Sequence, residues 1–126
     1  MKIQTKDLTG AALDWSVAVA LGWKLERPQD GQFIDNDGNR WLAGYRQYAP
    51  KISFSPSSNW AQGGPLVQSQ LFWVEEQSYD QWGAEGVGGE TQYGPTALIA
   101  ICRAVVACKL GDEVDVPDEL VPGGAA

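Results

Sequence analysis

One stretch near the end of the chain, residues 94–111, constrains the fold more than any other. At 100° per residue it predicts a helix with one broad aliphatic face, made by Leu98, Ile101, Cys102, Val105 and Val106. The opposite face carries Ala97, Ala100, Ala104 and Ala107. Pro95 suits the first helical position, and Gly111 suits the left-handed residue that ends a helix. Because a helix that is apolar on two sides is buried on both, we expect this one at the centre of the core.

A second helix is predicted near the start of the chain, over residues 8–21. Thr5 or Thr9 suits its N-cap, and Gly22 suits its end. This helix is also apolar on two sides, and small residues lie along it at Ala11, Ala12 and Ala18. We expect these small residues to meet the alanine face of the last helix, since small side chains let two helix axes approach closely.

The middle of the chain predicts short strands. Residues 32–34 and 40–43 flank the turn sequence of residues 35–39, which indicates a hairpin. The aspartates of this turn resemble a calcium loop, but Phe33 occupies a position that needs an oxygen ligand, so a plain turn is the better interpretation. Residues 71–76 and 81–87 predict a second strand pair, joined by a turn at 77–80.

The other segments are irregular or extended. Residues 49–65 predict an exposed loop, and residues 66–70 a single helical turn. Residues 1–4 are interpreted as a short strand or an extended lead-in, and the alternating segment around Val114 and Val116 as an extended arm lying on the domain. We therefore predict one α+β domain over residues 1–120, in which two long helices pack together and on one small antiparallel sheet, followed by a flexible tail at 121–126.

Composition excludes several classes of function. The chain of 126 residues has no histidine, which removes His-dependent triads and the commonest metal ligand. A net charge of −7 disfavours binding to nucleic acid. Cys102 and Cys108 lie in apolar surroundings and are interpreted as buried, unreactive thiols of a reducing compartment. Neither a secretion signal nor a membrane-spanning run is recognisable, so no membrane association is expected.

Catalytic motifs are not recognisable in the sequence either. The carboxylates that an enzyme could use have no diagnostic spacing; they are Asp14, Glu75, Glu76, Glu85 and Glu90. No metal or cofactor motif is present, so none is expected. The chain has six tryptophans, more than a small domain can enclose completely. Some exposed aromatic surface is therefore expected, available to a partner or to a second copy.

Four stretches together resemble a known family. They are KDLTGAALDW at residues 6–15, NWAQGGPL at 59–66, YGPTALIA at 93–100, and KLGDEV at 109–114 continuing into Pro117 and Leu120. In order and spacing this set is similar to the phage NinX-like family, small proteins of tailed phages and prophages without an assigned function. The resemblance implies a phage or prophage origin and a location in the host cytoplasm. It implies no catalytic or binding residue.

The best candidate site combines the central loop with the start of the last helix. Its residues are Asn59, Trp60, Gln62, Gly63, Gly64, Tyr93 and Arg103. Trp60 offers a stacking surface, Asn59 and Gln62 offer donors and acceptors, and the glycines allow close approach. The alternative interpretation is structural: Trp60 fills the core, the glycines turn the chain, and Arg103 pairs with Asp14 or another carboxylate.

The function that the sequence favours is a non-enzymatic phage accessory protein that binds a host or phage protein, with a homo-oligomer as one form. A small-molecule or nucleotide-type binder, or a minor enzyme that uses the Trp60 loop, is the alternative. Acidic mimicry of nucleic acid is weakened because many of the charges lie in the segment after Gly111.

Overall fold

The C-terminal helix is covered on both sides, as its two apolar faces predict. The computed structural model describes residues 1–27, 31–86 and 91–121. In it, α4 spans Ala97–Leu110 and ends at Gly111, whose φ is 89°. The expected helix start was wrong by two residues, because Thr96 is the N-cap and its hydroxyl accepts a hydrogen bond from the Ile99 amide at 3.2 Å. Pro95 therefore precedes the cap.

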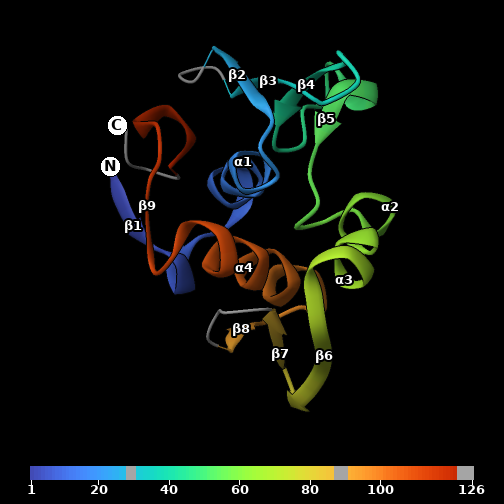
Figure 1. Ribbon diagram of the computed structural model, residues 1–126, viewed down its shortest axis with the longest axis vertical. Helices are drawn as coiled ribbons and strands as arrows, with labels where there is room; N and C mark the ends of the chain where they lie inside the picture. Colours follow the sequence, from blue (N-terminus) through green and yellow to red (C-terminus); the bar gives the residue numbers. More distant parts are fainter. Residues whose placement is uncertain (28–30, 87–90, 122–126) are drawn as a thin grey trace.

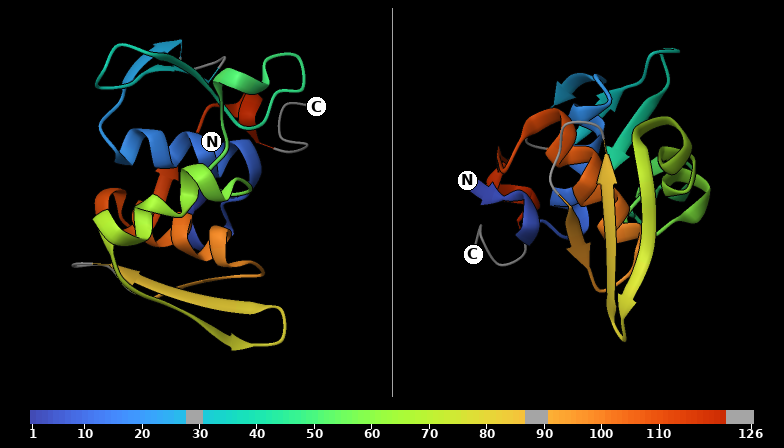
Figure 2. Two further views of the ribbon diagram at one scale, coloured as in Figure 1. Left: turned by 90° about the vertical axis from the view of Figure 1, so that its right-hand side faces the viewer. Right: turned by 60° about the horizontal axis from the view of Figure 1, so that its bottom comes forward.

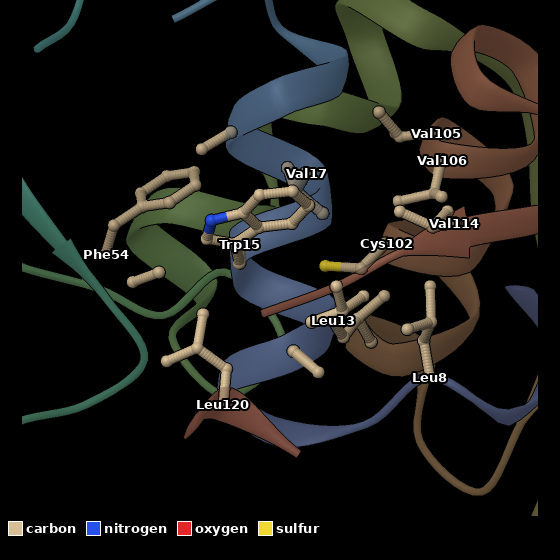
Figure 3. Packing of buried hydrophobic residues seen from close by; sticks show 14 of the residues in the cluster. Leu8, Leu13, Trp15, Val17, Phe54, Cys102, Val105, Val106, Val114 and Leu120 are labelled. Carbon is tan, nitrogen blue, oxygen red and sulfur yellow. The ribbon is translucent and has the colours of Figure 1, made fainter. Parts of the chain in front are cut away.

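The aliphatic face of α4 packs against α1, which spans Gly10–Ala20. Thr9 is the N-cap of α1, while Thr5 opens the separate turn η1 (Thr5–Asp7). Figure 3 shows side chains of both helices meeting in one cluster, which also takes in Val114 and Leu120. The members with no exposed surface include Leu8, Leu13, Val17, Ile101, Cys102, Val105 and Val106. The prediction that the two helices pack together is confirmed.

The alanine face of α4 has a different neighbour from the one expected. Ala100 and Ala104 form a separate buried cluster with Ala84, which lies on a strand and not on α1. Small side chains suit this contact because the sheet comes very close to the helix. At Gly94, for example, an added Cβ would lie 2.9 Å from the Ala100 amide nitrogen. The alanines thus let a sheet pack close to one face of α4, and the larger aliphatic residues on the other face fill the space between the two helices.

The sheet on the alanine face has three strands in the order β6-β7-β8. β6 (Leu71–Ser78) and β7 (Gln81–Gly86) form the predicted hairpin. Residue 87, the predicted end of the second strand, lies outside the described residues. The third strand, β8 (Gln92–Gly94), was not predicted; it pairs with β7 so that Tyr93 lies opposite Gly83.

A four-stranded sheet, ordered β2-β3-β4-β5, covers the other side of the helix pair near α1. Its strands are β2 (Lys24–Arg27), β3 (Gln32–Ile34), β4 (Arg40–Ala43) and β5 (Ser53–Phe54). β4 and β5 are parallel, so this sheet is not wholly antiparallel as expected.

The predicted hairpin between β3 and β4 is confirmed. The Asp35 carboxylate accepts hydrogen bonds from the Trp41 indole at 2.8 Å and from the Asn39 and Asp37 amides, each at 2.9 Å. These bonds, that from Trp41 first, lower the pKa of Asp35. The Asp35 carboxylate therefore serves to close its own turn.

The two ends of the described chain pair with each other. β1 (Lys2–Gln4) runs antiparallel to β9 (Glu113–Asp115), and the turn η4 (Asp118–Leu120) follows. Val114 and Val116 are buried, which confirms the prediction that the acidic segment lies extended on the domain. The predicted tail of residues 121–126 lies outside the described residues except for Val121.

Four layers follow one another in Figures 1 and 2: the three-stranded sheet, α4, α1 and the four-stranded sheet. The α+β class is confirmed, but the expected single sheet is wrong. The short helices α2 (Trp60–Gly63) and α3 (Pro65–Gln70) carry the chain along the flank of the helix pair, so strands before and after them reach opposite sides. Among the described residues, each helix falls short of the length and apolar character that crossing a bilayer requires.

Candidate functional site

Trp60 lies on the surface at the start of α2. The segment predicted as an irregular loop contains this helix, and the Asn59 side chain caps it by accepting a hydrogen bond from the Ala61 amide at 2.9 Å. Trp60 is 59% exposed, so it does not fill the core. The packing interpretation of Trp60 is therefore wrong, and a large aromatic surface remains open at this end of α2.

Gln62 fixes α2 to the strand beneath it. Its amide oxygen accepts a hydrogen bond from the Ser55 amide at 2.6 Å, and its amide nitrogen donates to the Ser53 carbonyl at 2.9 Å. Both ends of the side chain are therefore engaged within the protein. Gln62 supports the Trp60 helix, and its side chain holds that helix against β5.

Gly63 sits where α2 crosses other backbone. A Cβ on Gly63 would lie 2.4 Å from the Pro56 carbonyl oxygen and 2.7 Å from Leu98 Cδ2. Gly64 is also close to its surroundings, since a Cβ there would lie 2.8 Å from the Trp60 carbonyl oxygen. The two glycines serve close approach, as predicted, but the approaching groups belong to the protein itself.

Replacing Gly63 by alanine should lower the free energy of unfolding by about 2–3 kcal/mol, because the methyl group overlaps backbone that cannot move freely. Urea denaturation followed by tryptophan fluorescence measures this loss. Gln68→Ala on the exposed side of α3 is the matched control and should leave the midpoint unchanged. Equal midpoints for Gly63→Ala and the wild type would contradict the close contact.

Arg103 is 9% exposed and binds two backbone carbonyls. Its Nε donates to the Leu8 carbonyl oxygen at 3.0 Å, and its Nη1 donates to the Tyr93 carbonyl oxygen at 2.7 Å. Burial lowers the pKa of the guanidinium, against the opposing charge of Asp7. Within the described parts of the chain no carboxylate forms an ion pair with Arg103, so the alternative that it pairs with Asp14 or another carboxylate is wrong there.

The seven predicted site residues fall into two separate groups. Tyr93 and Arg103 line an open cleft of about 700 Å³, together with residues of the β6–β7 turn and η1. Trp60 and Gln62 do not line this cleft. The separation follows from the helix between them: Leu98, which touches α2, and Arg103 are five residues apart and therefore point roughly 140° apart around α4.

Asp14 is a buried carboxyl group whose role the sequence did not reveal. It is 2% exposed on α1, and its Oδ1 accepts a hydrogen bond from the Ser57 amide at 2.9 Å. Burial raises its pKa to about 7, although the hydrogen bonds from Ser57 lower it. Burial, with Asp14 nearby, also raises the pKa of the Cys102 thiol, in agreement with the predicted unreactive cysteine; Cys108 is only half-buried.

The other candidate carboxylates form no catalytic arrangement that the described residues reveal. Glu85 accepts hydrogen bonds from the Trp73 indole at 3.2 Å and from the Thr91 hydroxyl at 3.3 Å, and Glu75 accepts one from Gln77. Glu76 is exposed, and Glu90 lies outside the described residues. Within residues 1–27, 31–86 and 91–121, no cluster of three side chains of the kinds that ligate metals occurs.

Comparison with known proteins gives the family. The family model described as "Bacteriophage P22, NinX" matches residues 4–109. The chain belongs to this phage family. No curated protein matches the sequence.

The NinX match runs from the end of β1 to the last turn of α4. It therefore includes both groups of predicted site residues as well as Asp14. Membership in the NinX family indicates a phage accessory protein.

Proposed function

We propose that this protein is a non-enzymatic accessory protein that binds a host or phage protein in the host cytoplasm. The contact is made by the aromatic surface, defined here as Tyr45, Tyr48, Ile52 and Trp60. These side chains are 63%, 79%, 40% and 59% exposed. The exposed Trp60 on a fixed helix is the observation that carries the proposal, because tryptophan and tyrosine dominate the energetics of protein interfaces.

One buried serine, Ser53, connects the backbone segments that carry the aromatic surface. The Ser53 hydroxyl accepts a hydrogen bond from the Arg46 amide at 2.7 Å and lies 2.9 Å from the Ala49 carbonyl oxygen, to which it can donate. The Ser53 carbonyl oxygen in turn accepts from Gln62. The segment with the tyrosines and the helix with Trp60 are therefore tied to the same residue of β5. A rigid aromatic surface loses little conformational entropy on binding.

The aromatic surface suits a protein better than a small ligand. Trp60 lies outside the cleft, so its ring is presented outward on a helix of one turn. Exposed aromatic side chains on a small domain are typical of an interaction surface. A second copy of the chain is one such partner, and sedimentation velocity on the purified protein detects it.

Replacing Trp60 by alanine should weaken partner binding by at least 30-fold, the loss expected at an interface hot spot. Its effect on the free energy of unfolding should stay within about 1 kcal/mol, because the ring is mostly exposed. A pull-down from infected host cells identifies the partner, and calorimetry with the purified pair measures the affinity.

Tyr79→Ala is the matched control for this experiment. Tyr79 is 92% exposed but lies on the β6–β7 turn, away from α2. It should retain the partner at wild-type affinity. Retention of every partner by Trp60→Ala at unchanged affinity would contradict the proposal.

A further inference from the structure

The open cleft beside Arg103 is a second feature, separate from the aromatic surface. It lies between η1, the start of α4, the turn of the β6–β7 hairpin and β8. Its volume of about 700 Å³ is within the range of small-molecule sites in proteins. We propose that this cleft binds a nucleotide, with the phosphate group held by Arg103 and Lys6.

Arg103 provides the phosphate contact. Its guanidinium uses Nε and Nη1 to hold backbone carbonyls, and Nη2 makes no hydrogen bond to any part of the chain that the structure describes. Arg103 lines the cleft and forms no ion pair among the described residues, although the charge of Asp7 acts on it, so its Nη2 remains available to an incoming anion. The two backbone bonds fix the plane of the guanidinium, so Nη2 can donate a charge-assisted hydrogen bond to a phosphate oxygen.

Two further features of this wall favour an anion. Lys6 on η1 lines the same cleft and is exposed, so its ammonium group is free to reorient toward a ligand. Gly94 and Pro95 also line it, and because they directly precede the Thr96 cap, the positive N-terminal end of α4 lies next to the cleft. In a chain of net charge −7, the cleft lining has two cations, Lys6 and Arg103, against one carboxylate, Asp80, which suits a small anion better than a long polyanion.

Side chains of the hairpin and of β8 that line the cleft favour the rest of a nucleotide. Tyr79 and Tyr93 are 92% and 46% exposed and both line the cleft, which provides aromatic surface for a base. Asp80, on the turn of the hairpin, lines it as well. Its carboxylate accepts hydrogen bonds from ribose hydroxyls and would repel a bare anion. The cleft therefore offers cations on η1 and α4 to a phosphate and a carboxylate on the hairpin to hydroxyl groups.

The test is a titration of the ¹⁵N-labelled full chain with adenosine monophosphate, followed by amide and arginine Nε resonances. We expect saturable shifts at Gln92, Gly94 and the Nε of Arg103. Adenosine should bind at least tenfold more weakly, because it lacks the phosphate. Inorganic phosphate should shift the Arg103 Nε resonance but leave the ring resonances of Tyr79 unchanged.

Variants distinguish binding at the cleft from a non-specific effect of the protein's charge. Lys6→Glu should lower the affinity for adenosine monophosphate at least tenfold. Lys24→Glu makes the same charge change on exposed β2 and should leave this affinity unchanged. Tyr79→Ala should lower the affinity for adenosine monophosphate without changing the affinity for inorganic phosphate. The proposal is overturned by the absence of shifts at Gln92, Gly94 and Arg103, by equal affinity for adenosine and its monophosphate, or by equal losses in Lys6→Glu and Lys24→Glu. Trp60→Ala leaves this binding intact, so the result is independent of the protein-binding proposal.

Discussion

Replacing Trp15 by alanine should lower the free energy of unfolding by about 3–5 kcal/mol, the range typical of a large aromatic residue removed from a core. Trp15 is 6% exposed on α1 and meets Phe33 edge to face, with ring centroids 6.0 Å apart. It joins α1 to the four-stranded sheet, and Figure 3 shows its indole nitrogen turned toward the side of Phe54. Urea denaturation with far-ultraviolet circular dichroism measures the loss.

Trp15→Phe is the matched control, and it should lower the free energy of unfolding clearly less than Trp15→Ala does. The buried indole Nε1 of Trp15 has no hydrogen-bond partner among the described residues. Phenylalanine keeps most of the packed ring and removes this unsatisfied donor, which offsets part of the lost contact. Equal losses for the two variants would show that the ring does not pack as described.

Asp14→Asn should flatten the pH dependence of stability between about pH 4 and pH 8. Burial raises the pKa of Asp14 from 3.8 to about 7, so the folded protein binds a proton more tightly than the unfolded chain does. The stability that this proton contributes is fully present below pH 3.8 and is lost as pH rises through 7. Since one pKa unit corresponds to ~1.4 kcal/mol, the loss reaches up to about 4 kcal/mol.

Urea denaturation of both proteins across this pH range measures the difference. Asparagine keeps an oxygen that accepts the hydrogen bond from the Ser57 amide, so the fold is preserved while the titrating group is removed. Asp35→Asn, on the exposed turn where the pKa is lowered, should not flatten the curve in this direction. Parallel curves for Asp14→Asn and the wild type would contradict the raised pKa.

The local elements that the sequence predicts well are those with their own start and stop signals. Gly22 and Gly111 end α1 and α4 with φ values of 81° and 89°, and Asp35 closes its turn with its own carboxylate. β8 was missed because three residues between other elements carry no periodicity; its pairing with β7 defines it. The helix α2 was hidden for the same reason, although the sequence Asn59-Trp60-Ala61 contains its cap.

The candidate site was only partly predictable. Sequence alone selected Trp60 and Arg103 as unusual, but it could not show that α4 separates them. Nor could it show that Gln62 is occupied by Ser53 and Ser55, since both bonds join residues seven and nine positions apart through the fold. The sequence offered five candidate carboxylates of equal standing, and only the structure showed that Asp14 is buried.

By itself, the sequence determined the two helices, their apolar faces, the strand pairs and the phage family. These depend on local periodicity, capping and turn chemistry, which act over a few residues. The tertiary structure decided which face meets which neighbour. Alanine and glycine permit a close approach without specifying the partner, so only the packed chain placed a sheet on the alanine face of α4 and opened a cleft beside Arg103.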